Sequence, residues 1–298
     1  MAERHDVVTN TRETRVAVFA LLTGALIWGL IWYPYRILRD AGVEGIVAST
    51  TSYFIAFVIG LVLFRRQLGQ VRFSWTLFWL ALSAGGCNLG YVLATLEGEI
   101  VRVLLLFYLA PLWTVLLSRF LLGERLSGYG VFVIALSLSG AATVLWQPSV
   151  GLPMPQDVAD WLGLGAGFMF ALFNVLSRLA RGVSIEARSM IAFAGVVLSG
   201  VGLMLFGLAV PHIPSAISVW LLLGLIGVVL VLVNLVVQYG LSRVASNRAI
   251  VIMLSEVGFA ALSSWLLAGE ALGLREWMGG ALIVAAGILS ARMDNSNS

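Results

Sequence analysis

One carboxylate, Glu256, lies well inside an apolar stretch of the sequence, seven residues beyond Ala249. A helix rises about 1.5 Å per residue, so this carboxylate is roughly 10 Å from the start of the stretch. Ionisable groups inside a membrane are costly and are usually functional or paired. Three roles stay open for Glu256. It binds the ammonium group of a substrate, it carries a coupled proton because burial favours its neutral form, or it is a structural acid that pairs with an arginine or with the backbone.

Uncharged polar side chains recur at helical spacing in other apolar stretches. Asn88 and Tyr91 are three residues apart and Asn234 and Gln238 are four apart, so each pair lies on one helix face. Such groups either line a substrate cavity or form hydrogen bonds between helices. With two deeply placed aromatic residues and Glu256, the predicted substrate-binding residues are Trp28, Asn88, Tyr91, Tyr108, Asn174, Asn234, Gln238 and Glu256.

Pro111 lies in the middle of the apolar stretch 101–122. A proline has no N–H group, so the carbonyl of Phe107, four residues earlier, loses its helical partner. The residue therefore acts as a hinge, exposes a carbonyl in the substrate path, or produces a static kink. We predict a hinge.

The residue types that many other kinds of site require are scarce. The chain has one cysteine and two histidines, His5 and His212, neither of which lies in an apolar stretch. An internal disulfide, a histidine metal cluster and a histidine-based triad are therefore excluded. No HExxH, GxSxG or Walker motif occurs either. We expect no enzymatic activity, no metal and no cofactor. A pI of 9.3 does not indicate nucleic-acid binding, because basic cytoplasmic loops of a membrane protein give the same value.

The composition indicates the elements that position these residues. Of 298 residues, 60% are apolar and 11% are charged, with a mean hydropathy of +0.99, whereas soluble domains have about 25% charged residues. Ten apolar stretches, most of them roughly 17–25 residues long, can cross a membrane as helices. Aromatic residues near their ends, such as Trp32 and Tyr35, are expected at the membrane interface. The stretches are 16–35, 45–64, 75–95, 101–122, 128–146, 161–179, 189–210, 218–240, 249–268 and 277–291. They predict an all-α polytopic membrane protein.

The arginines predict the orientation of the chain. There is no lysine, and with the N-terminus in the cytoplasm 14 of the 18 basic residues fall on the cytoplasmic side. This is the bias of the positive-inside rule, so we expect both termini in the cytoplasm. The predicted organisation is a cytoplasmic tail (1–15), a first half of five helices (16–146), an extracytoplasmic linker rich in proline (147–160), a second half of five helices (161–292) and a cytoplasmic tail (293–298).

The two halves resemble each other. Each contains a tyrosine, then a serine and then a Gly-Glu pair: Tyr91, Ser118, Gly123 and Glu124 in the first half, and Tyr239, Ser264, Gly269 and Glu270 in the second. Because five is an odd number, a tandem copy must be inverted in the membrane, an arrangement found in many secondary transporters. Glu124 and Glu270 lie at helix ends, where we expect structural roles, either capping neighbouring helices or pairing with Arg125 or Arg275.

These features are similar to those of a known family. With Trp28-Gly29 in the first predicted helix, Pro111 before the first Gly-Glu pair and the second pair closing the ninth helix, the chain resembles the EamA type of the drug/metabolite transporter (DMT) superfamily. The resemblance covers nearly the whole chain. Bacterial exporters of aromatic and other amino acids look most similar, particularly over residues 107–112. The resemblance implies a multi-pass secondary transporter of the bacterial inner membrane that exports neutral amino acids and related metabolites by alternating access. We expect a monomer or homodimer.

Other functions are less consistent with the residues. A multidrug antiporter for lipophilic cations is the main alternative, but small relatives in this superfamily use a glutamate in the first helix, and residues 16–35 contain no acid. An organic-phosphate antiporter would need lysine or arginine facing the cavity, and no basic residue lies deep in any predicted span.

Overall fold

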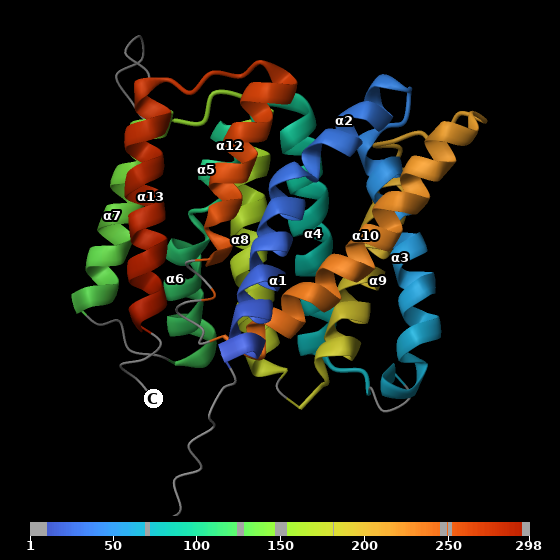
Figure 1. Cartoon of the computed structure of the whole chain (residues 1–298), viewed down its shortest axis with the longest axis horizontal. Helices are drawn as coiled ribbons and strands as arrows, with labels where there is room; N and C mark the ends of the chain where they lie inside the picture. Colours follow the sequence, from blue (N-terminus) through green and yellow to red (C-terminus); the bar gives the residue numbers. More distant parts are fainter. Residues whose placement is uncertain are drawn as a thin grey trace, which may run out of the picture.

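The protein is a bundle of helices. The computed structural model describes residues 11–68, 72–123, 128–146, 154–180, 182–244, 249 and 252–293, and no β-strand occurs within these ranges. The expected all-α fold is confirmed, with α7 and α13 at one edge of the bundle and α3 and α9 at the other (Figure 1). The helices are α1 (Thr11–Leu30), α2 (Trp32–Asp40), α3 (Gly45–Leu68), α4 (Trp75–Glu97), α5 (Ile100–Phe107), α6 (Ala110–Leu122), α7 (Gly128–Leu145), α8 (Val158–Leu179), α9 (Ile185–Leu205), α10 (Ile217–Leu241), α12 (Ser255–Ala268) and α13 (Leu274–Met293).

Seven helical stretches among the described residues are long and apolar enough to cross a membrane. Each coincides with a predicted span to within five residues at each end. They are Arg15–Asp40, Gly45–Arg66, Trp75–Glu97, Ile100–Leu122, Val158–Leu179, Ile185–Leu205 and Ile217–Leu241. The other three predicted spans correspond to α7, α12 and α13, so the arrangement as ten spans in two inverted sets stays a prediction.

Two of these long stretches are broken in the middle. The first breaks at Ile31, between α1 and α2. The second breaks between Phe107, which ends α5, and Ala110, which begins α6. Pro111 therefore lies in the first turn of α6, where its missing N–H group has no helical partner to lose. The interruption expected at Pro111 is present, and its function as a hinge stays a prediction.

The helices α6 and α12 end in the same way. Each is followed by a glycine in the left-handed conformation, Gly123 with φ 71° and Gly269 with φ 69°. The N–H groups of these glycines bind the carbonyls of Ser118 and Ser264, respectively. Glycine adopts this conformation without a Cβ clash, which explains the glycine of both Gly-Glu pairs. The first glutamate of these pairs, Glu124, lies outside the described residues.

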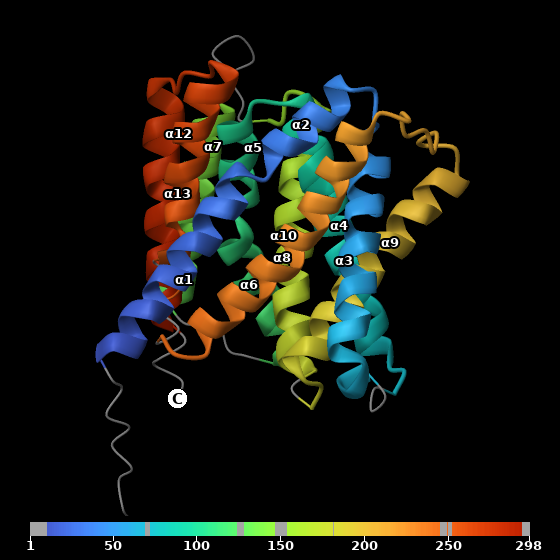
Figure 2. The same ribbon diagram turned by 45° about the vertical axis from the view of Figure 1, so that its right-hand side comes forward.

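The packing of α1 and α4 connects the two halves. Helix α4 packs against α8 and α9, and α1 packs against α10 and α12 (Figure 2). A Cβ atom at Gly29 would lie 2.8 Å from Phe259 Cβ and 3.0 Å from the carbonyl oxygen of Glu256. The absence of a side chain at this position therefore lets α1 approach α12 closely beside Glu256.

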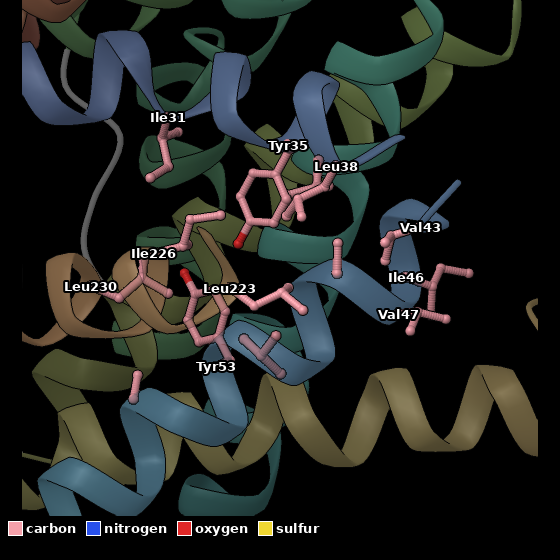
Figure 3. Close-up of a cluster of buried hydrophobic side chains, with 14 of the residues drawn as sticks. Ile31, Tyr35, Leu38, Val43, Ile46, Val47, Tyr53, Leu223, Ile226 and Leu230 are labelled. Atoms are coloured by element: carbon pink, nitrogen blue, oxygen red, sulfur yellow. The ribbon is translucent and has the colours of Figure 1, made fainter. Parts of the chain in front are cut away.

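An apolar core holds the short helix α2 across one end of the bundle. Figure 3 shows side chains from around α2, from α3 and from α10 that pack together in this core. Tyr35 and Leu38 of α2 are 1% and 0% exposed, respectively. Van der Waals packing of this kind holds helices together in a membrane. It fixes α2 at the part of the bundle that we call the α2 end, where Trp32 and Arg36 meet the second half.

Candidate functional site

Glu256 and Tyr108 meet where two helix boundaries face each other. Tyr108 directly follows α5, and Glu256 lies in the first turn of α12. The Tyr108 hydroxyl donates a hydrogen bond of 2.8 Å to Glu256 Oε2. The first turn of a helix favours a carboxylate, because unpaired backbone N–H groups give that end a partial positive charge. These two predicted residues form a polar contact between the first and second halves.

Aromatic rings from both halves lie beside this contact. The ring of Phe107 lies 5.8 Å from Tyr108, 5.5 Å from Tyr91 and 5.2 Å from Phe170 of α8, measured between ring centroids. The hydroxyl oxygen of Tyr91 is buried and has no hydrogen-bond partner among the residues that the structure describes. The structure thus brings Tyr91, Tyr108 and Glu256 into one region, together with two phenylalanines that were not predicted as site residues.

Trp32 is also part of this region, although its position near a predicted helix end indicated only an interfacial residue. It is 1% exposed and packs in one cluster with Tyr91 and Tyr108. Its indole N–H donates a hydrogen bond of 3.1 Å to Ser263 Oγ on α12. Trp28, the predicted site tryptophan, packs instead against the core beneath α2. The sequence placed Trp28 deeper than Trp32, but the chain breaks at Ile31 between them, and Trp32 is buried at the start of α2.

Two predicted amides are engaged by neighbouring helices. Ser49 of α3 donates a hydrogen bond to Asn88 Oδ1, and Asn88 Nδ2 donates one of 2.9 Å to the Tyr53 hydroxyl. Ser189 of α9 donates one of 3.0 Å to Asn234 Oδ1. Both amides therefore connect helices within one half, as interhelical hydrogen bonds do. A contact of either residue with substrate stays a prediction.

The other two predicted amides have unused polar groups. Asn174 of α8 and Gln238 of α10 are partly buried. Neither side chain forms a hydrogen bond within the described parts of the chain. They retain donors and acceptors for a ligand, but neither is bonded to Glu256 or Tyr108.

Glu270 joins the halves at the α2 end. Its Oε1 lies 3.2 Å from Arg36 Nη2, and its Oε2 accepts a 2.8 Å hydrogen bond from the N–H of Ile100, the first residue of α5. Arg36 also binds the carbonyls of Thr95 and Gly98. Glu270 thus bonds the first N–H group of α5 and pairs with Arg36, while Arg275 binds a backbone carbonyl. A structural role for Glu270 stays a prediction.

The electrostatic environment of Glu270 contains opposing effects. Burial raises the pKa of the Glu270 carboxyl above its ordinary value, and the nearby Glu99 adds to this effect. The Ile100 N–H and the Arg36 guanidinium act against it, because both favour the carboxylate. The net direction is upward, so this carboxyl takes up a proton more readily than an exposed glutamate.

A second ion pair lies close by. Arg102 Nε and Nη2 donate hydrogen bonds of 2.7 and 2.8 Å to the two carboxylate oxygens of Asp160, whose side chain is 1% exposed. Arg102 also binds the carbonyl of Val144, so the pair joins α5, α7 and α8. A cavity of about 430 Å³ lies beside both ion pairs. Its acidic lining residues are Glu97, Glu99, Asp157, Asp160, Glu270 and Glu276.

Comparison with known proteins identifies the family. The sequence profile of the EamA-like transporter family matches residues 15–146 and 158–292. The chain belongs to the EamA-like transporter family. A protein of Archaeoglobus fulgidus described as an uncharacterized transporter is 28% identical to this EamA-type transporter over 281 residues, which are 94% of this chain and 97% of that protein.

The fold of this EamA-type transporter is also found in a solved crystal structure. The two chains are 20% identical and superpose with a TM-score of 0.61 over 93% of this chain and 98% of the other. The family membership suggested by the sequence is confirmed, and with its seven apolar helices the protein is a multi-pass membrane transporter.

Proposed function

We propose that this EamA-type transporter exports aromatic and other neutral amino acids, and related small metabolites, by alternating access. One observation carries the proposal: a carboxylate, Glu256, is held by Tyr108 between the two halves and beside a group of aromatic rings. The carboxylate is complementary to a substrate ammonium group. The rings of Phe107, Phe170 and Tyr91 are complementary to an aromatic or apolar substrate side chain.

The remaining predicted residues complete this substrate site in the proposal. Tyr91 has a buried hydroxyl without a partner among the described residues, and it can donate a hydrogen bond to a substrate carboxylate. The amides of Asn174 and Gln238 are also unbonded within the described ranges. Asn88 lies on α4, Trp28 lies on α1, and Asn234 lies on α10, which packs against α1. No group from outside the chain is needed for binding of this kind.

The proposed architecture is two inverted repeats of five helices, 16–146 and 161–292, joined by an extracytoplasmic linker at 147–160. The family profile matches two stretches with nearly these limits, 15–146 and 158–292. The equivalent ends of α6 and α12, each with a left-handed glycine bonded to a serine carbonyl, support the same pairing. The tails at 1–15 and 293–298 are cytoplasmic in this scheme, and the membrane is the bacterial inner membrane.

Alternating access requires contacts between the halves that form at one end and break at the other. At the α2 end, which is extracytoplasmic in this scheme, the halves are joined by Arg36–Glu270, Arg102–Asp160 and Trp32–Ser263. At the opposite end, the Tyr129 hydroxyl donates a hydrogen bond to the carbonyl of Leu289. In the proposal, the contacts at the α2 end correspond to a transporter that is closed on its outer side.

A transporter of lipophilic cations is the second candidate, because the same carboxylate and aromatic rings can bind an organic cation. Purified protein in liposomes distinguishes the two. Counterflow of labelled phenylalanine, tryptophan and leucine is compared with that of tetraphenylphosphonium, with and without a pH gradient. The proposal expects amino acid exchange that unlabelled phenylalanine inhibits and tetraphenylphosphonium does not. Preferred exchange of tetraphenylphosphonium would establish the alternative.

A further inference from the structure

Trp32 lies near two of the charged contacts that join the halves. The guanidinium carbon of Arg36 lies 5.0 Å from the centre of the Trp32 ring, within the range of a cation–π interaction. On its other side, the ring packs in one cluster with Tyr108, the residue that binds Glu256. Trp32 is thus placed between the Arg36–Glu270 pair and the Tyr108–Glu256 pair.

The geometry of α2 and α12 extends this connection. Trp32 and Arg36 are four residues apart on α2 and therefore lie on one face of that helix. On α12, Glu256 and Ser263 are seven residues apart, which is about two turns, so they also share a face. Ser263 is 5% exposed and receives the Trp32 indole N–H. One face of α12 therefore presents Glu256 to Tyr108 and Ser263 to Trp32.

A ligand that displaces Tyr108 from Glu256 disturbs this arrangement. The Tyr108 hydroxyl lies 2.8 Å from Glu256 Oε2, so an ammonium group that takes its place at this oxygen moves Tyr108 away from α12. Tyr108 packs against the apolar cluster that contains Trp32, and α12 is bonded to the indole through Ser263, so this displacement is passed to Trp32.

We infer that Trp32 is a positioning residue that couples occupancy of the Glu256 site to opening of the α2 end. Displacement of α12 or Tyr108 shifts the indole, and the shift weakens the Arg36–Glu270 contact because Arg36 rests on the indole ring. This inference rests on the proposed function, since it assigns a ligand to Glu256. It differs from a packing role, in which loss of the indole would reduce stability without changing the coupling.

Thiol labelling in lipid nanodiscs tests the coupling. The native cysteine is removed (Cys87→Ser) and a reporter is introduced by Thr95→Cys. Thr95 is 1% exposed, and its carbonyl is bound by Arg36, so the reporter should react with a maleimide only when the α2 end opens. Saturating phenylalanine should raise the labelling rate about fivefold or more, the usual range of allosteric coupling. Arg36→Gln should give fast labelling with or without phenylalanine.

Two variants interrupt the proposed path. Trp32→Phe keeps a ring but removes the indole N–H, and Ser263→Ala removes its acceptor. Each should reduce the phenylalanine effect on labelling to less than twofold while the phenylalanine Kd changes less than threefold. The double variant should resemble either single variant. Trp113→Phe is the matched control, because the indole nitrogen of Trp113 is buried and has no hydrogen-bond partner in the described part of the chain. This control should retain the full effect.

A second comparison needs no ligand. Glu256→Gln should change the reporter labelling rate when residue 32 is tryptophan and should have no effect in the Trp32→Phe background. If phenylalanine fails to bind the parent protein, the proposed substrate is wrong, and this second comparison still decides the role of Trp32. The inference is overturned if phenylalanine, or Glu256→Gln, changes the labelling rate of the reporter as much in both Trp32→Phe and Ser263→Ala as in the parent. It is also overturned if Trp32→Phe lowers the melting temperature but keeps the full effect of phenylalanine on labelling, because the indole would then contribute only to packing.

Discussion

The hydroxyl of Tyr108 and the carboxylate of Glu256 are 2.8 Å apart, although the two residues are separated by 148 positions in the chain. Each lies beside a helix boundary within a long apolar stretch. Residues at such boundaries approach backbone groups that are free of helical hydrogen bonds. In transporters with interrupted helices, such places are used to bind substrates.

Gly167 tests how closely the halves pack beside this site. A Cβ atom at Gly167 would lie 2.5 Å from the carbonyl oxygen of Phe107, whereas one at Gly165 on the same helix would meet nothing within 4 Å. Gly167→Ala should therefore reduce stability by about 1–3 kcal/mol, the usual cost of overpacking. Gly165→Ala should be neutral or stabilising. Thermal unfolding in detergent measures both, and equal melting temperatures would show that α8 can move away from α5 at no cost.

Some features of this site could be predicted from the sequence, because they depend on the types of neighbouring residues along the chain. Glu256 was identified as the only acid deep in a span, and Pro111 as the cause of a helix interruption. Seven spans agree with the structure because apolar length alone defines them. The glycine at the end of α12 was visible in the Gly-Glu pair, since a positive φ favours glycine.

The partners of these residues could not be predicted in the same way. Helical spacing tells which residues share a face but does not tell which helix that face meets. Glu270 pairs with Arg36, 234 positions away, and not with the nearby Arg275. Asn88 binds Ser49 and Tyr53, which carried no separate signal. Trp32 was missed because its burial depends on the break at Ile31, which turns α2 across the bundle.

Pro111→Ala tests the hinge. Alanine restores an N–H group at position 111 that can bind the Phe107 carbonyl and join α5 to α6. Membrane insertion and melting temperature should stay near those of the parent, while the rate of substrate counterflow should fall several-fold. The measurement is counterflow in liposomes at matched protein content. An unchanged counterflow rate would show that Pro111 has a packing role and does not act as a hinge.

The Glu270 carboxyl should make stability depend on pH in a defined direction. Its pKa is raised by burial above the value of about 4.3 for an unfolded glutamate. Between these two pKa values the folded state binds more protons than the unfolded state, so the contribution of Glu270 is largest at low pH and is lost as pH rises. Because glutamine resembles the protonated acid, Glu270→Gln should match the parent near pH 4, should be at least as stable as the parent at pH 7, and should lack this part of the pH dependence.

Melting temperatures of Glu270→Gln and parent between pH 4 and pH 8 measure that difference. Glu97→Gln, an exposed carboxylate at the end of α4, is the control and should follow the parent curve. A large loss of stability in Glu270→Gln at pH 7, with none at pH 4, would show instead that folding lowers the pKa of Glu270.

The topology is tested by labelling from one side of the membrane. In the Cys87→Ser background, Gln156→Cys should react with an impermeant maleimide added outside intact cells. Ser184→Cys should react only after the membrane is permeabilised. These positions precede α8 and α9, respectively, so they should lie on opposite sides. The reverse pattern would invert the orientation deduced from the arginines.

The central claim is that Glu256 binds the ammonium group of the substrate, and Glu256→Gln tests it most directly. Glutamine has nearly the shape of glutamate, so the fold should be kept, while the charge is lost and the hydrogen bond from Tyr108 becomes weaker. Titration of the purified variant with phenylalanine should give a Kd at least about tenfold weaker, which corresponds to about 1.4 kcal/mol, at every pH from 5 to 8. The Glu97→Gln control should bind like the parent. Parental affinity and parental counterflow in Glu256→Gln would contradict the account, and normal affinity with loss of pH-driven accumulation would assign the residue to proton coupling instead.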